Sequence, residues 1–113
     1  MVDKLPFRFL DIGPHRYKVV VNLKRLEEIE ESEGTRLFGA IIMGEFQIIL
    51  RPGMPASQLR ETLLHEICHV VYDRYIVISG PQEGWEEPIV SSFSFALTEV
   101  FQRNKAFARW FVS

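Results

Sequence analysis

The chain has 113 residues, of which 47% are hydrophobic and 12% aromatic, and this composition excludes an intrinsically disordered protein. The formal net charge is −2 and no long basic cluster appears, which argues against nucleic acid or an anionic membrane as a partner. No apolar run approaches the roughly 18 residues of a membrane span, and no signal peptide opens the chain. With Cys68 as the single cysteine, which we expect in the core, no intrachain disulfide forms. We therefore expect a cytoplasmic protein with a single domain over residues 1–113.

The first third of the chain predicts two strands and a helix. Phe7 to Ile12 and Arg16 to Val21 are rich in β-branched and aromatic residues, and Gly13-Pro14 separates them. A helix is predicted from Leu23 to Ser32, because Asn22 is a good N-cap and Gly34 fits just past the end.

Two further apolar runs predict an antiparallel pair of strands. They cover Leu37 to Met43 and Phe46 to Leu50, and Gly44-Glu45 lies between them. A two-residue connection with glycine first is typical of a type II′ hairpin turn. After Pro52 and Gly53, a second helix is predicted to begin near Pro55 or Ser57 and to run to Arg74 or Tyr75.

The C-terminal part predicts a loop from Ile76 to Glu86 and a last helix that starts near Pro88. Apolar residues at helical spacing give this helix a core stripe: Ile89, Phe93, Ala96, Leu97, Val100 and Phe101. Phe107, Trp110 and Phe111 are expected to continue its packing. Together the elements predict an α+β domain in which a small, mostly antiparallel sheet packs on the second helix, with two other helices.

The second helix contains the motif H-E-x-x-H, formed by His65, Glu66 and His69. In a helix, residues four apart project from the same face, so both imidazoles can reach one zinc ion at about 2.0–2.1 Å. Glu66 follows the first histidine and emerges beside the metal, where it can accept a proton from water. The motif therefore predicts a zinc site. The alternative is a structural pair of histidines on the polar edge of an amphipathic helix.

Catalytic zinc commonly takes three protein ligands and leaves a fourth position for water. We expect Glu87 to be the third ligand, because its helix must pack on the motif helix and so bring its own first turn near the histidines. Glu86 is the nearest alternative, although acidic residues at a helix N-terminus are also favoured by the helix dipole. Glu83, Asp73 and His15 remain further alternatives.

The stretch Leu64-His65-Glu66-Ile67-Cys68-His69 and the helix that begins at Glu87 resemble the ImmA/IrrE-like phage and bacterial metallopeptidases, compact zincins of the gluzincin branch. In that family a glutamate ligand leads a helix of the form E-x-x-A-N-x-F-A-x-x-L. Glu87 and Phe93 match this spacing, whereas Val90 and Ser91 replace the alanine and the asparagine. The resemblance covers roughly residues 35–100.

The resemblance implies a zincin-like minimal metallopeptidase domain that holds Zn²⁺ through His65, His69 and Glu87. It also implies that a sheet edge beside the cleft pairs with an extended protein or peptide substrate. The substrate-binding residues expected on that edge are Gly39, Ala40 and Ile41. An ordinary core strand with a bulge at Gly39 is the alternative.

The expected reaction is hydrolysis of a peptide bond in a protein substrate, with Glu66 as the general base. Tyr72, Arg74, Tyr75 and His15 are candidates for stabilising the developing oxyanion, and the sequence does not choose among them. Two other functions are open: a catalytically inactive zinc-binding module, and a metal-free protein-interaction module of phage origin. The sequence does not indicate the substrate or the oligomeric state.

Overall fold

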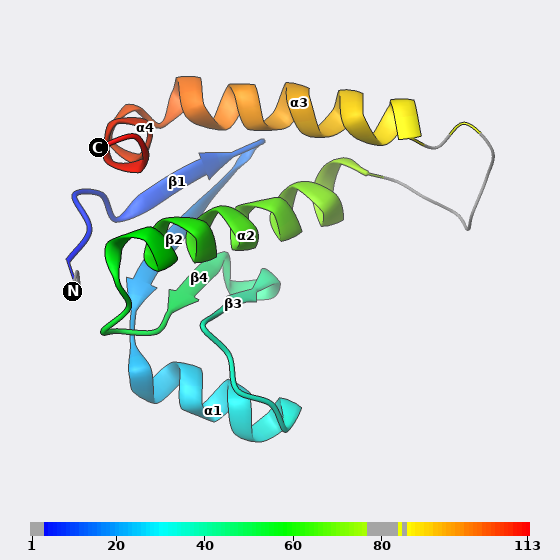
Figure 1. Ribbon diagram of the computed structural model, residues 1–113. Coiled ribbons are helices and arrows are strands. Elements are labelled where there is room, and N and C mark those ends of the chain that lie inside the picture. Colours follow the sequence, from blue (N-terminus) through cyan, green and yellow to red (C-terminus); the bar gives the residue numbers. More distant parts are fainter. Residues whose placement is uncertain (1–3, 77–83, 85) are drawn as a thin grey trace.

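The computed structural model describes residues 4–76, 84 and 86–113, and within them the chain is a compact α+β fold of four helices and a mixed four-stranded sheet (Figure 1). The strand order is β1-β2-β4-β3. The predicted α+β class is therefore confirmed.

Local hairpins and one long crossover build the sheet. β1 (Phe9–Ile12) pairs antiparallel with β2 (His15–Val21), and β3 (Gly39–Ile42) pairs antiparallel with β4 (Gln47–Leu50). β2 and β4 run parallel, which makes the sheet mixed. The antiparallel pairing of β3 with β4 confirms the prediction. The pairing of β1 with β2 and the parallel pairing of β2 with β4 were not predicted. β3 is an edge strand, since β4 is its one strand neighbour within the described residues.

α1 (Leu23–Glu33) starts and ends at the predicted caps. The Asn22 side chain accepts a hydrogen bond from the Arg25 N–H at 3.0 Å, and Gly34 adopts a left-handed φ of 73°. These signals were readable from the sequence because each depends on a neighbouring residue alone.

The β3–β4 connection differs from the predicted two-residue turn. A short 3₁₀ segment, η1 (Met43–Glu45), is followed by Phe46 with a φ of 53°, a conformation that costs energy for a bulky residue. The Phe46 ring stacks on the His15 ring at 4.5 Å between centroids, and the Arg74 guanidinium lies 5.5 Å from its centre. These contacts are made by distant residues and hold the turn in this form.

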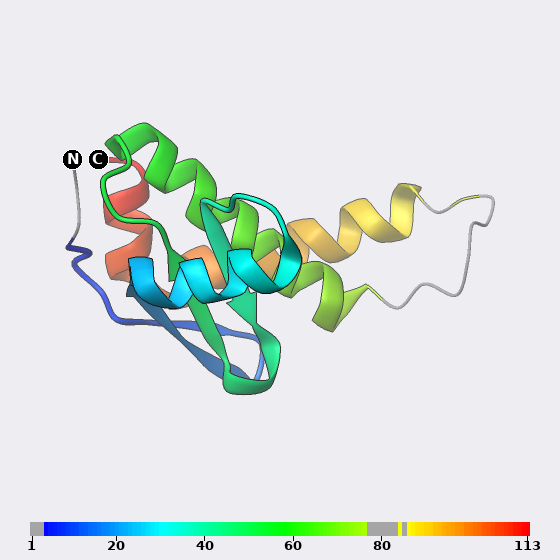
Figure 2. The ribbon, with the colours of Figure 1, turned by 90° about the horizontal axis from the view of Figure 1, so that it is seen from below.

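The helices cover both faces of the sheet (Figures 1 and 2). α2 (Ala56–Tyr75) and α3 (Glu86–Arg103) lie on one face, where Ile48 and Leu50 join the larger core. α1 lies on the other face and packs against Ile49 through Leu26. Successive residues of a strand point to opposite faces of the sheet, so Ile48 and Leu50 pack into one core and Ile49 packs into the other. α2 ends at Tyr75, within the predicted range.

The predicted last helix is divided in two at Asn104, and α4 (Lys105–Phe111) follows the break. Asn104 is buried, and its side chain accepts a hydrogen bond from the Asp11 N–H at 2.8 Å. It also donates to the Asp11 carbonyl at 2.9 Å and to the Val100 carbonyl at 2.8 Å. Phe107, Trp110 and Phe111 pack into the larger core, as expected.

Across residues 4–76, 84 and 86–113, no helix has both the length and the apolar character needed to cross a membrane.

Replacing Asn104 by alanine is expected to lower the free energy of unfolding by about 1–3 kcal/mol, because it leaves the backbone of Asp11 without its partner. Urea denaturation followed by circular dichroism measures the change. Gln102→Ala, at an exposed position in the last turn of α3, is the control and should stay within about 0.5 kcal/mol of the wild type. Equal stability of the two variants would contradict this role of Asn104.

Candidate functional site

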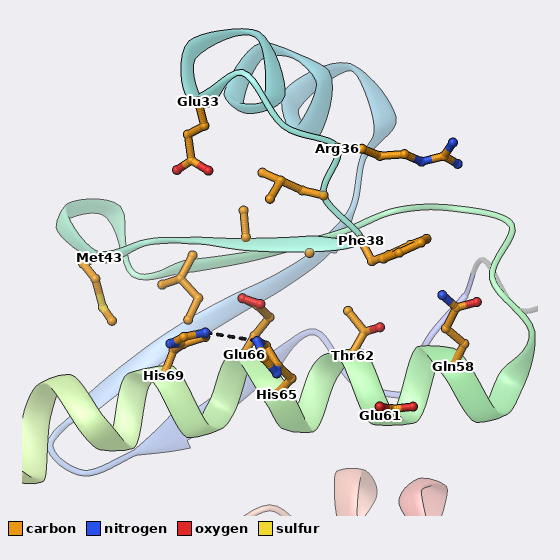
Figure 3. A pocket seen from close by; sticks show the side chains of 14 residues that line it. Glu33, Arg36, Phe38, Met43, Gln58, Glu61, Thr62, His65, Glu66 and His69 are labelled. Atoms are coloured by element: carbon orange, nitrogen blue, oxygen red, sulfur yellow. Dashed lines mark hydrogen bonds between the residues drawn. The ribbon is translucent and has the colours of Figure 1, made fainter.

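A cleft of about 690 Å³ runs between β3 and α2 (Figure 3). One wall is formed by the end of α1, the connection to β3, β3 itself and Met43. The other wall is one side of α2, and its lining residues are Gln58, Glu61, Thr62, His65, Glu66 and His69. The whole H-E-x-x-H motif therefore faces the cleft, opposite an edge strand.

The two histidines of the motif converge in this cleft. Their Nε2 atoms lie 3.1 Å apart, and both side chains are exposed. Two nitrogen ligands of one tetrahedral zinc, at about 2.0–2.1 Å each, lie roughly 3.3 Å apart. The geometry of His65 and His69 therefore fits two ligands of a shared zinc ion.

Glu66 lies on the buried flank of α2 and is 6% exposed. Its side chain points toward β3 (Figure 3) and makes no hydrogen bond or ion pair with any other residue that the structure describes. Burial raises the pKa of the Glu66 carboxyl, and the charges of His69 and His65 act in the opposite direction. A carboxylate in this environment is a stronger base than one in water.

Gly39 makes the close approach of β3 to α2 possible. A methyl group at Gly39 would lie 3.0 Å from Thr62 Cγ2, 3.2 Å from Glu66 Cγ and 3.3 Å from the Ile49 carbonyl oxygen. A side chain at this position would require Thr62 and Glu66 to shift away from β3.

Hydrogen bonds from α1 and β4 fix the segment that leads into β3. The Leu37 N–H donates to Glu30 at 2.7 Å, Arg51 donates to the Leu37 carbonyl at 2.9 Å, and Arg51 also pairs with Glu30. The hydrogen bond from Leu37, together with the charges of Arg51 and Arg36, lowers the pKa of the Glu30 carboxyl, against a smaller opposing effect of desolvation. This wall of the cleft is therefore held by side chains that are ionised at neutral pH.

Glu87, the expected third ligand, does not line the cleft. It is exposed in the first turn of α3, where it accepts a hydrogen bond from Ser91 Oγ at 3.3 Å. α2 lies between β3 and α3, so the histidines and the body of α3 are on different sides of α2 (Figures 1 and 3). Among the described residues, no three side chains of the metal-ligating types lie close enough together to hold a metal ion.

The alternatives for the third ligand are also away from the described lining of the cleft. Glu86 is exposed at the start of α3, Asp73 lies 3.7 Å from Arg74, and His15 stacks on Phe46. Glu83 lies outside the described residues.

Three of the four candidates for oxyanion stabilisation, Arg74, Tyr75 and His15, make contacts elsewhere in the fold. Arg74 donates to Tyr17 Oη at 3.3 Å, and Tyr75 lies against Gly13 in the β1–β2 turn. Neither of these, nor Tyr72 or His15, is among the described residues that line the cleft. Cys68 is half-buried outside this lining, and burial raises the pKa of its thiol.

The predicted substrate strand does lie at the cleft. Gly39, Ala40 and Ile41 all line it, and the pairing with β4 is continuous from Gly39 to Ile42, so β3 has no bulge. Other lining residues were not predicted. Gln58 and Glu61 could have been found, since Glu61 is four residues before His65 on the same face of α2. Glu33 and Arg36 could not, because the fold alone brings the end of α1 to this site.

No family model, curated protein or solved structure matches this chain. The assignment of function therefore depends on the residues and the geometry of this cleft.

Gly39→Ala is expected to lower the free energy of unfolding by about 1–3 kcal/mol, because the added methyl group forces β3 away from Thr62 and Glu66. Gly44→Ala is the matched control: nothing lies within 4 Å of its added methyl group, so the change should stay within about 0.5 kcal/mol. Thermal and urea denaturation measure the free energy of unfolding of both variants. Equal stabilities would show that β3 does not need the close approach.

Proposed function

We propose that this chain is a zinc-dependent peptidase that hydrolyses a peptide bond in a protein substrate. The observation that carries the proposal is the convergence of the His65 and His69 Nε2 atoms to 3.1 Å, beside the buried carboxylate of Glu66. A zinc ion bound there would supply Lewis-acid activation of water and of the scissile carbonyl.

Glu66 would move the proton in this reaction. Its carboxylate faces the same cleft as the histidines and has no partner of its own among the described residues, so it is free to accept a proton from the attacking water. The same oxygen would then donate that proton to the leaving amine. Burial favours both steps, since a raised pKa brings the carboxyl nearer to neutral pH.

β3 would orient the substrate. Gly39, Ala40 and Ile41 line the cleft from an edge strand whose outer side has no strand partner in the described part of the chain. An extended peptide added to that edge gains main-chain hydrogen bonds and lies across from His65 and His69. Gly39 would leave its backbone open to such a peptide.

Glu87 remains the third ligand in this proposal, with Glu86 as the alternative. Because neither lines the cleft, binding by Glu87 would require the first turn of α3 to move toward His69. The same observation favours a second candidate function, a module that binds a peptide in this cleft without cutting it.

Metal content tests the site. The purified protein, supplied with zinc and dialysed, is expected to hold about one zinc per chain by mass spectrometry, because the two histidine nitrogens are already at ligand spacing. His69→Ala should lose the metal. His15→Ala removes a histidine that stacks on Phe46 outside the cleft and should keep it.

Each outcome of this measurement has a clear meaning. Loss of zinc in Glu87→Gln, with retention in Glu86→Gln, would assign Glu87 as the third ligand, and the reverse result would assign Glu86. A wild-type protein that binds no zinc would overturn the peptidase proposal.

Glu66→Gln is expected to keep the zinc and to lose hydrolysis by about 10²–10⁴-fold, because the amide has nearly the same shape but accepts no proton. Cleavage of an unfolded protein such as casein, followed by mass spectrometry of the products, measures the loss. Glu27→Gln, at an exposed position of α1 that does not line the cleft, controls for the removal of a negative charge and should retain hydrolysis. Undiminished cleavage by Glu66→Gln would remove Glu66 from the mechanism.

A further inference from the structure

Two carboxylates with no partner stand on opposite walls of the cleft. Glu33 projects from the end of α1 above β3, and Glu61 projects from α2 below it (Figure 3). Neither carboxylate forms an ion pair or a side-chain hydrogen bond with another described residue. Several other acids in the described part of the chain are paired: Glu30 with Arg51, Glu28 and Glu45 with Arg25, and Glu99 with Arg103.

Arg36 is the one cationic side chain among the described residues of the cleft. Its guanidinium lies 5.8 Å from the centre of the Phe38 ring, and its charge contributes to the lowered pKa of Glu30. Arg36 lies over Phe38 and forms no ion pair with Glu33 or Glu61 among the described residues.

Glu66 adds a third carboxylate, and it points independently to a ligand. It is 6% exposed, lines the cleft and has no hydrogen-bond partner in the described residues. A carboxylate in a buried, low-dielectric position favours a ligand that brings positive charge or hydrogen-bond donors. Without a bound metal, the cleft therefore carries the three carboxylates of Glu33, Glu61 and Glu66 against the single guanidinium of Arg36. Low-dielectric walls strengthen the local field of such charges.

We infer that the substrate is an extended polypeptide segment with lysine or arginine side chains on both sides of the bond to be cleaved, which Glu33 and Glu61 recognise. The inference rests on the proposed function and names its substrate class. The edge of β3 selects extended main chain, and the two acids on opposite walls select basic side chains. An acidic segment in the same cleft would face like charges on both walls.

Binding to the Glu66→Gln protein tests this inference separately from hydrolysis. The probes are two fluorescein-labelled eight-residue peptides of alanine and leucine that carry either two lysines or two glutamates at the same positions. Each partly exposed ion pair changes affinity by about two- to fivefold, so the lysine peptide should bind on the order of tenfold more tightly in fluorescence anisotropy at low salt. The preference should decline as sodium chloride is raised toward 1 M.

Charge reversal provides the matched comparison. In the Glu66→Gln background, Glu33→Lys with Glu61→Lys should reverse the preference to the glutamate peptide. Glu27→Lys with Glu31→Lys makes the same change in net charge at exposed positions of α1 that do not line the cleft, and it should keep the preference for lysine.

The outcomes separate this inference from the proposed function. If neither peptide binds, or if both charge-reversed proteins behave alike, the inference is overturned. Cleavage by the wild type with no charge preference would overturn the inference and leave the peptidase standing. Selective binding of the lysine peptide that Glu33→Lys with Glu61→Lys reverses, without cleavage by the zinc-loaded wild type, would support the inference and overturn the peptidase.

Discussion

The close approach of β3 to α2 at Gly39 is the constraint on which the site depends. Because Gly39 has no side chain, Thr62 and Glu66 lie directly against the strand, and Glu66 is largely buried while it lines the cleft. The same approach places the free edge of β3 opposite the two histidines. A bulkier residue at this position would widen the cleft and expose Glu66 to water, with the loss of the burial that raises its pKa.

What the sequence predicts well is local. Asn22 and Gly34 mark the ends of α1 through contacts with their own helix, and the four-residue spacing of His65 and His69 places both on one face of α2. Such signals need no knowledge of the fold. The convergence of the two imidazoles follows from helix geometry alone, and for this reason the motif was the most informative part of the chain.

What the sequence does not predict depends on distant contacts. The parallel pairing of β2 with β4 is made across α1, the conformation of Phe46 depends on His15 and Arg74, and the division between α3 and α4 depends on Asn104. Asn104 bonds to Asp11, 93 residues away in the chain, so no window of sequence around it contains the reason for the break. The sequence likewise does not predict that Glu33 and Arg36 line the cleft, because the packing of α1 beside β3 brings them there.

In the proposed function, the site is divided between two parts of the fold, because Glu87 belongs to α3 and the other groups belong to α2 and β3. The histidines, Glu66 and the edge of β3 are placed by α2 and the sheet, and their geometry does not depend on α3, which packs on the other side of α2. Under that proposal, the cleft would bind a polypeptide along β3 with two of the three zinc ligands already in place. Movement of the first turn of α3 would then add the third ligand and complete the catalytic site. In such an arrangement recognition and catalysis would be separable properties, because the groups proposed to select the substrate lie on α1, β3 and α2, whereas the last ligand would come from the first turn of α3.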